Sequence, residues 1–182
     1  MYLKKIVGKK CYLSPIDEND SEKYAEWLND LEMTQYLVGL GPINVNVGNM
    51  RGILESAAQG HNYSIIDIET NELLGDCCFE GLNHLNQTSE VGIYIGNKEY
   101  WDKGFGTEAL SLLLDYGFKV LNLHCVYLQV VSFNDRAIKS YEKIGFEVVG
   151  KKREAILKGK ERYDMIYMDI LHNEFYEVFN EN

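Results

Sequence analysis

Two glycines, Gly104 and Gly106, stand where an apolar strand pattern passes into an apolar helix pattern. Glycine lets a ligand approach the backbone closely, and the first N–H groups of a helix have no partner inside the helix. Such a loop is a general anion site, so we expect it to bind the phosphate groups of a ligand. It lacks the Gly-Lys-Ser/Thr ending of a P-loop and the third glycine of a dinucleotide fingerprint, and a plain turn before a helix is the alternative interpretation.

A second pattern follows one strand later and runs Asn-Asp-Arg-Ala-Ile-Lys-Ser-Tyr-Glu-Lys-Ile-Gly-Phe from Asn134 to Phe146. In a helix, Asn134, Ala137 and Tyr141 share one face because they lie at i, i+3 and i+7. The glycine loop and this pattern together resemble the GNAT acetyltransferase superfamily, which has a Gly-x-Gly pyrophosphate loop followed by Asn-x-x-Ala…Tyr-Glu-Lys-x-Gly-Phe. The resemblance is strong from about Glu90 to Phe146 and extends more weakly over the whole chain.

The resemblance implies that acetyl-CoA is the cofactor and that the loop amides of residues 102–107 bind its pyrophosphate. It also implies that the strand backbone before the loop bonds the pantetheine arm, with help from Asn134. The cofactor-binding residues expected on this basis are Tyr94, Ile95, Gly96, Trp101, Asp102, Lys103, Gly104, Phe105, Gly106, Thr107, Asn134, Ala137 and Tyr141.

The loop departs from the family pattern at Trp101, where Arg or Gln is usual. In this position the chain resembles the ribosomal-protein-acetylating branch, which also has tryptophan there. Asp102 and Glu108 bring negative charge near the expected phosphates, and Lys103 is the only cation in the loop. We therefore expect cofactor binding to rest mainly on backbone N–H groups.

Acyl transfer from a thioester to an amine requires the amine to lose a proton and the leaving thiolate to gain one. The resemblance makes Tyr141 the acid, and a phenol with an ordinary pKa of about 10 holds its proton at neutral pH. It places a base on the strand that leads into the loop, where Glu90 stands, and Glu80 on the neighbouring strand is a rival. The alternatives are that Tyr141 simply packs on the sheet and that either glutamate is a solvated strand end.

The activity implied is N-acetylation of a primary amine by direct attack in a ternary complex, with no metal. The chain resembles the ribosomal-protein-alanine and spermidine acetyltransferase branches, so a protein N-terminus or a small amine is the expected acceptor and a polyamine is the alternative. Glu32, Tyr36 and Glu80 are candidates for binding the acceptor. A coenzyme A-binding sensor or scaffold without chemistry is the alternative of another class, and a nucleotide on the loop is a weaker one.

Composition bounds the domain organisation and excludes some classes of function. With 182 residues, 46% of them apolar, the chain is most simply one domain over residues 1–182. A net charge of −10 argues against nonspecific binding to nucleic acid, and the apolar runs are too short to span a membrane. The four cysteines show no metal-ligand spacing, which favours reduced thiols in a cytoplasmic protein. A monomer and a homodimer both remain open.

The pattern of elements predicts an α+β fold with one central mixed, mostly antiparallel sheet flanked by helices, as in the GNAT fold. We expect helices near residues 24–28, 31–37, 49–58, 106–120 and 135–144, and a tail helix over residues 174–181. A loop should cover residues 39–47. The predicted strands cover residues 5–15, 63–68, 73–79, 88–95, 125–131, 148–157 and 162–171, and the apolar run from Cys125 to Val131 should be buried on both faces.

Overall fold

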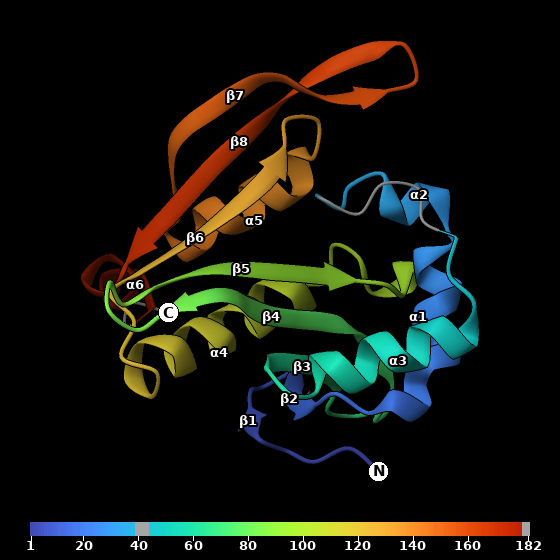
Figure 1. Cartoon of the computed structure of the whole chain (residues 1–182). Coiled ribbons are helices and arrows are strands. Elements are labelled where there is room, and N and C mark those ends of the chain that lie inside the picture. Colours follow the sequence, from blue (N-terminus) through green and yellow to red (C-terminus); the bar gives the residue numbers. More distant parts are fainter. Residues whose placement is uncertain (39–43, 180–182) are drawn as a thin grey trace.

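The computed structural model describes residues 1–38 and 44–179 as one sheet with helices on both faces (Figure 1). The strands are β1 Ile6–Val7, β2 Cys11–Pro15, β3 His61–Asp67, β4 Leu73–Asn83, β5 Thr88–Ile95, β6 Cys125–Val131, β7 Glu147–Lys158 and β8 Glu161–Leu171. The helices are α1 Ser21–Leu28, α2 Leu31–Thr34, α3 Val47–Ala57, α4 Phe105–Lys119, α5 Asp135–Ile144 and α6 His172–Phe179, with short 3₁₀ turns at Glu18–Asp20 and Lys98–Tyr100.

The sheet has the strand order β1-β2-β3-β4-β5-β6-β8-β7, and its neighbours are antiparallel except for β5 and β6. That parallel pair is registered only from Thr88 to Glu90 against Cys125 to Tyr127. Beyond Glu90 the two strands diverge, as Figure 1 shows in the middle of the molecule. The remaining main-chain groups on this side of β5 therefore have no strand partner and face a gap.

Each face of the sheet carries its own hydrophobic cluster. One cluster joins α4, α5 and α6 to the sheet and includes Leu110, Leu113 and Phe175. The other joins α1, α2 and α3 to the opposite face and includes Trp27 and Met33. Apolar residues at helical spacing produce both clusters, because each amphipathic helix buries its apolar stripe against the pleated sheet.

Most predicted elements are confirmed, with β5, β6 and the helix at residues 135–144 at the predicted bounds. The single strand expected over residues 5–15 is wrong, because the chain turns after Val7 and forms the hairpin β1–β2. Burial of β6 on both faces is also wrong, since Tyr127 and Gln129 are only half-buried where β6 leaves β5. Of the predicted loop at 39–47, residues 39–43 lie outside the described residues, and Val47 begins α3. The tail helix starts at His172, and residues 180 and 181 of its predicted span are likewise not described.

Candidate active site

A cavity of about 1320 Å³ lies where β5 and β6 diverge. The loop before α4 and the start of α5 line it from one side, and α1, α2 and α3 line it from the other. Among its lining residues are the expected Glu80, Glu90, Trp101, Asn134 and Tyr141. The structure therefore brings both predicted motifs and both candidate bases to one cavity.

The glycine loop presents an uncapped helix end to this cavity. Gly104 is the N-cap residue of α4 with φ of +83°, in the left-handed region that favours glycine, and no side chain caps the helix. Gly104, Gly106 and Thr107 line the cavity, and the Thr107 hydroxyl lies 2.7 Å from the Ser140 hydroxyl of α5. The free N–H groups and the dipole of this helix end suit a pyrophosphate.

The charges around the loop differ from those expected from the sequence. The Glu108 carboxylate points away from the cavity, because it accepts hydrogen bonds from the backbone N–H groups of Lys9 at 2.5 Å and Lys10 at 2.8 Å. It therefore fixes the β1–β2 turn and does not repel a phosphate. The Lys103 ammonium lies 5.5 Å from the centre of the Tyr100 ring, and Lys103 is not among the residues that line the cavity.

The cations that do line the cavity come from α5, and the sequence analysis missed them. Arg136, Lys139 and Lys143 stand at i, i+3 and i+7, so they share one side of the helix, and this spacing was visible in the sequence. The Arg136 guanidinium stacks 3.8 Å above the centre of the Trp101 ring. Trp101, at the position where the family usually has Arg or Gln, thus holds an arginine from another helix.

The strand that precedes the loop offers fewer open backbone groups than expected. The Trp101 indole donates to the Ile95 carbonyl at 2.7 Å, and the Gly96 N–H donates to Leu74 in β4 at 2.8 Å. Gly96 also packs on Trp27, since a Cβ there would lie 2.1 Å from its ring. Because main-chain groups alternate sides along a strand, those of Ile93 face the gap.

The face of α5 that carries Asn134, Ala137 and Tyr141 borders the cavity as predicted. The Asn134 side-chain oxygen accepts from the Ala137 N–H at 3.3 Å and so caps α5. The Tyr141 ring packs beside Phe146, with centroids 5.9 Å apart. Burial raises the pKa of Tyr141 to about 12, and the positive charge of Arg136 opposes this shift. The phenol is therefore protonated at neutral pH.

Carboxylates from β4 and β5 also line the cavity. Glu80 and Glu90 are direct cross-strand partners in β4 and β5, and the Gln129 amide donates to Glu90 at 2.9 Å. Asp76, which the sequence analysis missed, lies on the same face of β4 because it is four residues before Glu80. Its signal was an acidic residue inside an apolar run, between Gly75 and Cys77.

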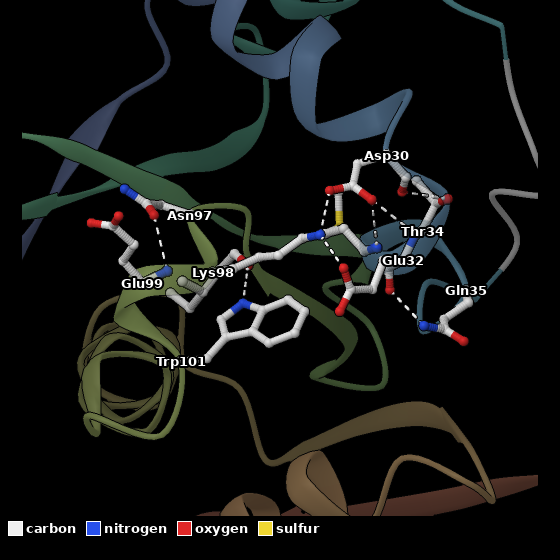
Figure 2. Close-up of polar contacts among 10 residues, drawn as sticks. Asp30, Glu32, Thr34, Gln35, Asn97, Lys98, Glu99 and Trp101 are labelled. Carbon is white, nitrogen blue, oxygen red and sulfur yellow. Dashed lines mark hydrogen bonds and ion pairs between the residues drawn. The ribbon is translucent and has the colours of Figure 1, made fainter.

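The two acceptor residues expected in the first helices lie in different surroundings. Tyr36 lines the cavity, with its ring centroid 6.3 Å from that of Trp101. Glu32 is exposed and does not line the cavity in the described part of the chain. Figure 2 shows why: the Lys98 ammonium lies between two carboxylates, 2.5 Å from Glu32 and 2.6 Å from Asp30. This cluster ties α2 to the segment that follows β5.

Comparison with known proteins identifies the class. Residues 10–147 match the family model described as an acetyltransferase (GNAT) domain, so the chain belongs to the GNAT acetyltransferase family. The predicted GNAT fold, the acetyl-CoA-dependent enzyme class and the acetyl donor are thereby confirmed. The uncapped α4 end and the α5 cations fit the phosphates of that donor.

Relatives differ in how much of the chain they match. The uncharacterized N-acetyltransferase p20 of Bacillus licheniformis is 29% identical over 174 residues, which is 92% of this chain and 96% of that protein. The spermidine N(1)-acetyltransferase of Escherichia coli K12 is 40% identical over 95 residues, only 52% of this chain and 50% of that protein.

Solved structures agree on the fold. A GNAT acetyltransferase from Bacillus anthracis superposes with a TM-score of 0.81 at 26% identity, over 96% of this chain and 100% of that one. The Vibrio cholerae spermidine N-acetyltransferase in complex with CoA and spermine gives 0.83 at 23% identity, over 92% and 99%. Among the described residues, no helix is both long and apolar enough to cross a membrane.

Proposed function

We propose that this enzyme acetylates a primary amine of a small molecule with more than one positive charge, by direct attack in a ternary complex. The observation that carries the proposal is the acidic wall of the cavity. In this wall Glu80 and Glu90 lie side by side on the adjacent strands β4 and β5, and Asp76 lies on the same face of the sheet. Carboxylates that line a cavity favour ammonium groups over neutral or anionic acceptors. The spermidine acetyltransferases among the relatives support the same class of acceptor.

Acetyl-CoA supplies an activated acetyl group as a thioester. In our proposal the α4 amides and the α5 cations hold its phosphates, and Asn134 with the gap-facing backbone of Ile93 holds the arm. This arrangement directs the thioester through the gap between β5 and β6 toward the acidic wall. The same gap brings the leaving sulfur to the α5 side, where Tyr141 lies.

Tyr141 is the proposed acid for the leaving thiolate. Tyr141→Phe should lower kcat by about 100-fold or more, because general acid catalysis contributes at least that factor. The dissociation constant for acetyl-CoA should stay unchanged, because the ring and its contact with Phe146 remain. Steady-state kinetics and calorimetric titration check the two expectations, and an unchanged kcat would remove Tyr141 from the mechanism.

The function is tested by calorimetric titration with acetyl-CoA, coenzyme A and ATP, followed by an acceptor screen. We expect both coenzyme A compounds to bind and ATP to bind far more weakly. In the screen, diamines and polyamines should have higher kcat/KM than monoamines of the same length and peptides with a free N-terminus. Preference for the peptides would overturn the acceptor class, and binding without transfer to any amine would support a sensor or scaffold.

A further inference from the structure

The acidic wall contains one carboxylate whose surroundings differ from those of its neighbours. Asp76 is paired in register with Ser64 of β3 and Tyr94 of β5, so it lies in the interior of the sheet and lines the cavity. It has the same parity along β4 as Cys78 and Glu80, and all three side chains emerge on the face covered by α1 and α3. The residue therefore lies one strand away from the gap, with β5 between them, and under the helices that cover this face of the sheet.

The groups that face Asp76 are neutral or acidic. They are the phenols of Tyr94 in β5 and Tyr24 in α1, the thiol of Cys78, and the carboxylate of Glu80. No lysine or arginine of the described residues acts on its charge. Asp76 is half-buried, and a desolvated carboxylate without a cationic partner is costly, so desolvation, helped by the charge of Glu80, raises the pKa of Asp76 to about 7.

We propose, on the basis of the function above, that Asp76 is a catalytic base that takes a proton from the acceptor's ammonium group, and that Tyr94 positions its carboxylate. An ammonium ion entering the cavity would supply the cationic partner that the protein itself does not provide. A carboxylate that titrates near neutral pH is matched to proton transfer at that pH. The hydroxyl of Tyr94 favours the ionised form, because it lowers the pKa that burial raises.

The proton balance assigns a separate role to each group. Asp76 takes one proton from R–NH₃⁺, and the freed lone pair forms the new N–C bond at the thioester carbonyl. As the C–S bond breaks, Tyr141 donates its phenolic proton to the departing sulfur. The nitrogen then loses its second proton, which restores the Tyr141 phenol through solvent. Asp76 releases its own proton to water, so the net reaction yields amide, thiol and one proton.

Glu90 is the alternative base, and its contacts suit a different task. One of its oxygens accepts a hydrogen bond from Gln129, and its cross-strand partner is the exposed Glu80. A pair of facing carboxylates can bind a second ammonium group of the acceptor. Asp76 and Glu80 are four residues apart on β4, or about 13 Å along an extended strand, which separates the proton-transfer position from this binding position.

The test compares Asp76→Asn with Glu90→Gln in the full chain, using a diamine acceptor. For the wild type, kcat/KM should rise with pH through about 7, since Asp76 must lose its proton. Asp76→Asn should remove this limb and lower kcat by about 100-fold or more. Glu90→Gln should raise KM and leave the limb in place. Asp20→Asn is a matched control, because Asp20 is also a carboxylate with a pKa raised by burial but lies outside the cavity lining.

Two further measurements separate a base from a merely structural residue. Hydroxylamine is unprotonated at neutral pH and needs no base, so Asp76→Asn should acetylate it nearly as fast as the wild type does. In the free protein, carboxyl NMR should show one aspartate titrating near pH 7 that disappears in Asp76→Asn, and Tyr94→Phe should raise its titration midpoint. Retention of the limb in Asp76→Asn would overturn the proposal and leave the acetyltransferase function intact. Failure of the wild type to acetylate any amine would overturn the function itself.

Discussion

Strands β4 and β5 have two faces of opposite character. On one face, Cys77, Phe79 and Val91 are buried against α4 in the larger hydrophobic cluster. On the other face, Asp76 and Glu80 alternate with them along the same strand and line the cavity. One hairpin therefore supplies both the core and the site, because successive side chains of a strand point to opposite sides. The same strand backbone therefore positions the side chains that line the cavity and those that form the core.

The two faces are expected to respond differently to substitution. A residue on the core face contributes to stability through buried apolar area and close packing, so truncating its side chain leaves a void. A carboxylate on the cavity face adds little or costs stability, because it is partly desolvated without a cationic partner. Substitutions on the first face should therefore change stability, and those on the second should change activity.

The largest stability effect should come from Phe79→Ala. Phe79 is 5% exposed and packs so closely on α4 that a Cβ at Gly117 would lie 2.5 Å from its ring. We expect the free energy of unfolding to fall by about 3–5 kcal/mol, as measured by urea denaturation. Its neighbour gives the control: Glu80→Gln should change that free energy by less than about 0.5 kcal/mol and raise KM for a cationic acceptor. Equal destabilisation by both variants would contradict the division between the faces.

A smaller effect of opposite sign is expected for Asp76→Asn. In the native protein the pKa of Asp76 is about 7, while in the unfolded chain an aspartate has a pKa of about 4. The native state thus holds the proton more tightly, so this group makes stability fall as pH rises from about 4 to about 7. Asparagine does not titrate. A shift of about three pKa units corresponds to about 4 kcal/mol, and solvent screening of the half-buried Asp76 reduces this, so the variant should be more stable than the wild type by about 2 kcal/mol at pH 8.

Thermal or urea unfolding at several pH values measures this difference. The gain should be small near pH 4 and should grow up to pH 7, and then remain level. Asp20→Asn again serves as a comparison outside the cavity. A gain that does not depend on pH would show that Asp76 is not the titrating group, and a loss of stability at pH 8 would show that its carboxylate is a structural partner.

The sequence predicted what local patterns determine. A β-branched and aromatic pattern located β5, and a nearly continuous apolar run located β6. The capping Asn134 and the terminal Gly145 located α5, because all of these signals depend on neighbours in the chain. The glycine loop was recognisable for the same reason. Residues at helical spacing could be placed together, which is how Asn134, Ala137 and Tyr141 were assigned to one face of a helix.

Contacts between distant segments could not be predicted in this way. Glu108 appeared to oppose a phosphate, and only the folded chain shows its carboxylate bound to the β1–β2 turn about a hundred positions away. The stacking of Arg136 on Trp101 and the ion pairs of Lys98 with Glu32 have the same origin. Charged residues that are close to the loop in sequence need not be close to it in space, because the direction of a side chain depends on tertiary packing.

The smallest effect, from Gly106→Ala, tests whether the loop is shaped for its ligand or for the fold. Gly106 lies in the first turn of α4, and a Cβ there would lie 3.6 Å from the Ile95 side chain, which is an ordinary contact. Alanine should stabilise the free protein by about 0.5–1 kcal/mol, as expected for Gly→Ala at an unstrained helical position. Because Gly106 lines the cavity, the added methyl group should also weaken acetyl-CoA binding, as measured by calorimetry.

Gly52→Ala in α3, where a Cβ meets nothing within 4 Å, should give a similar gain in stability without a change in affinity. If Gly106→Ala bound acetyl-CoA as tightly as the wild type, the glycine would serve the helix alone and the phosphates would lie elsewhere.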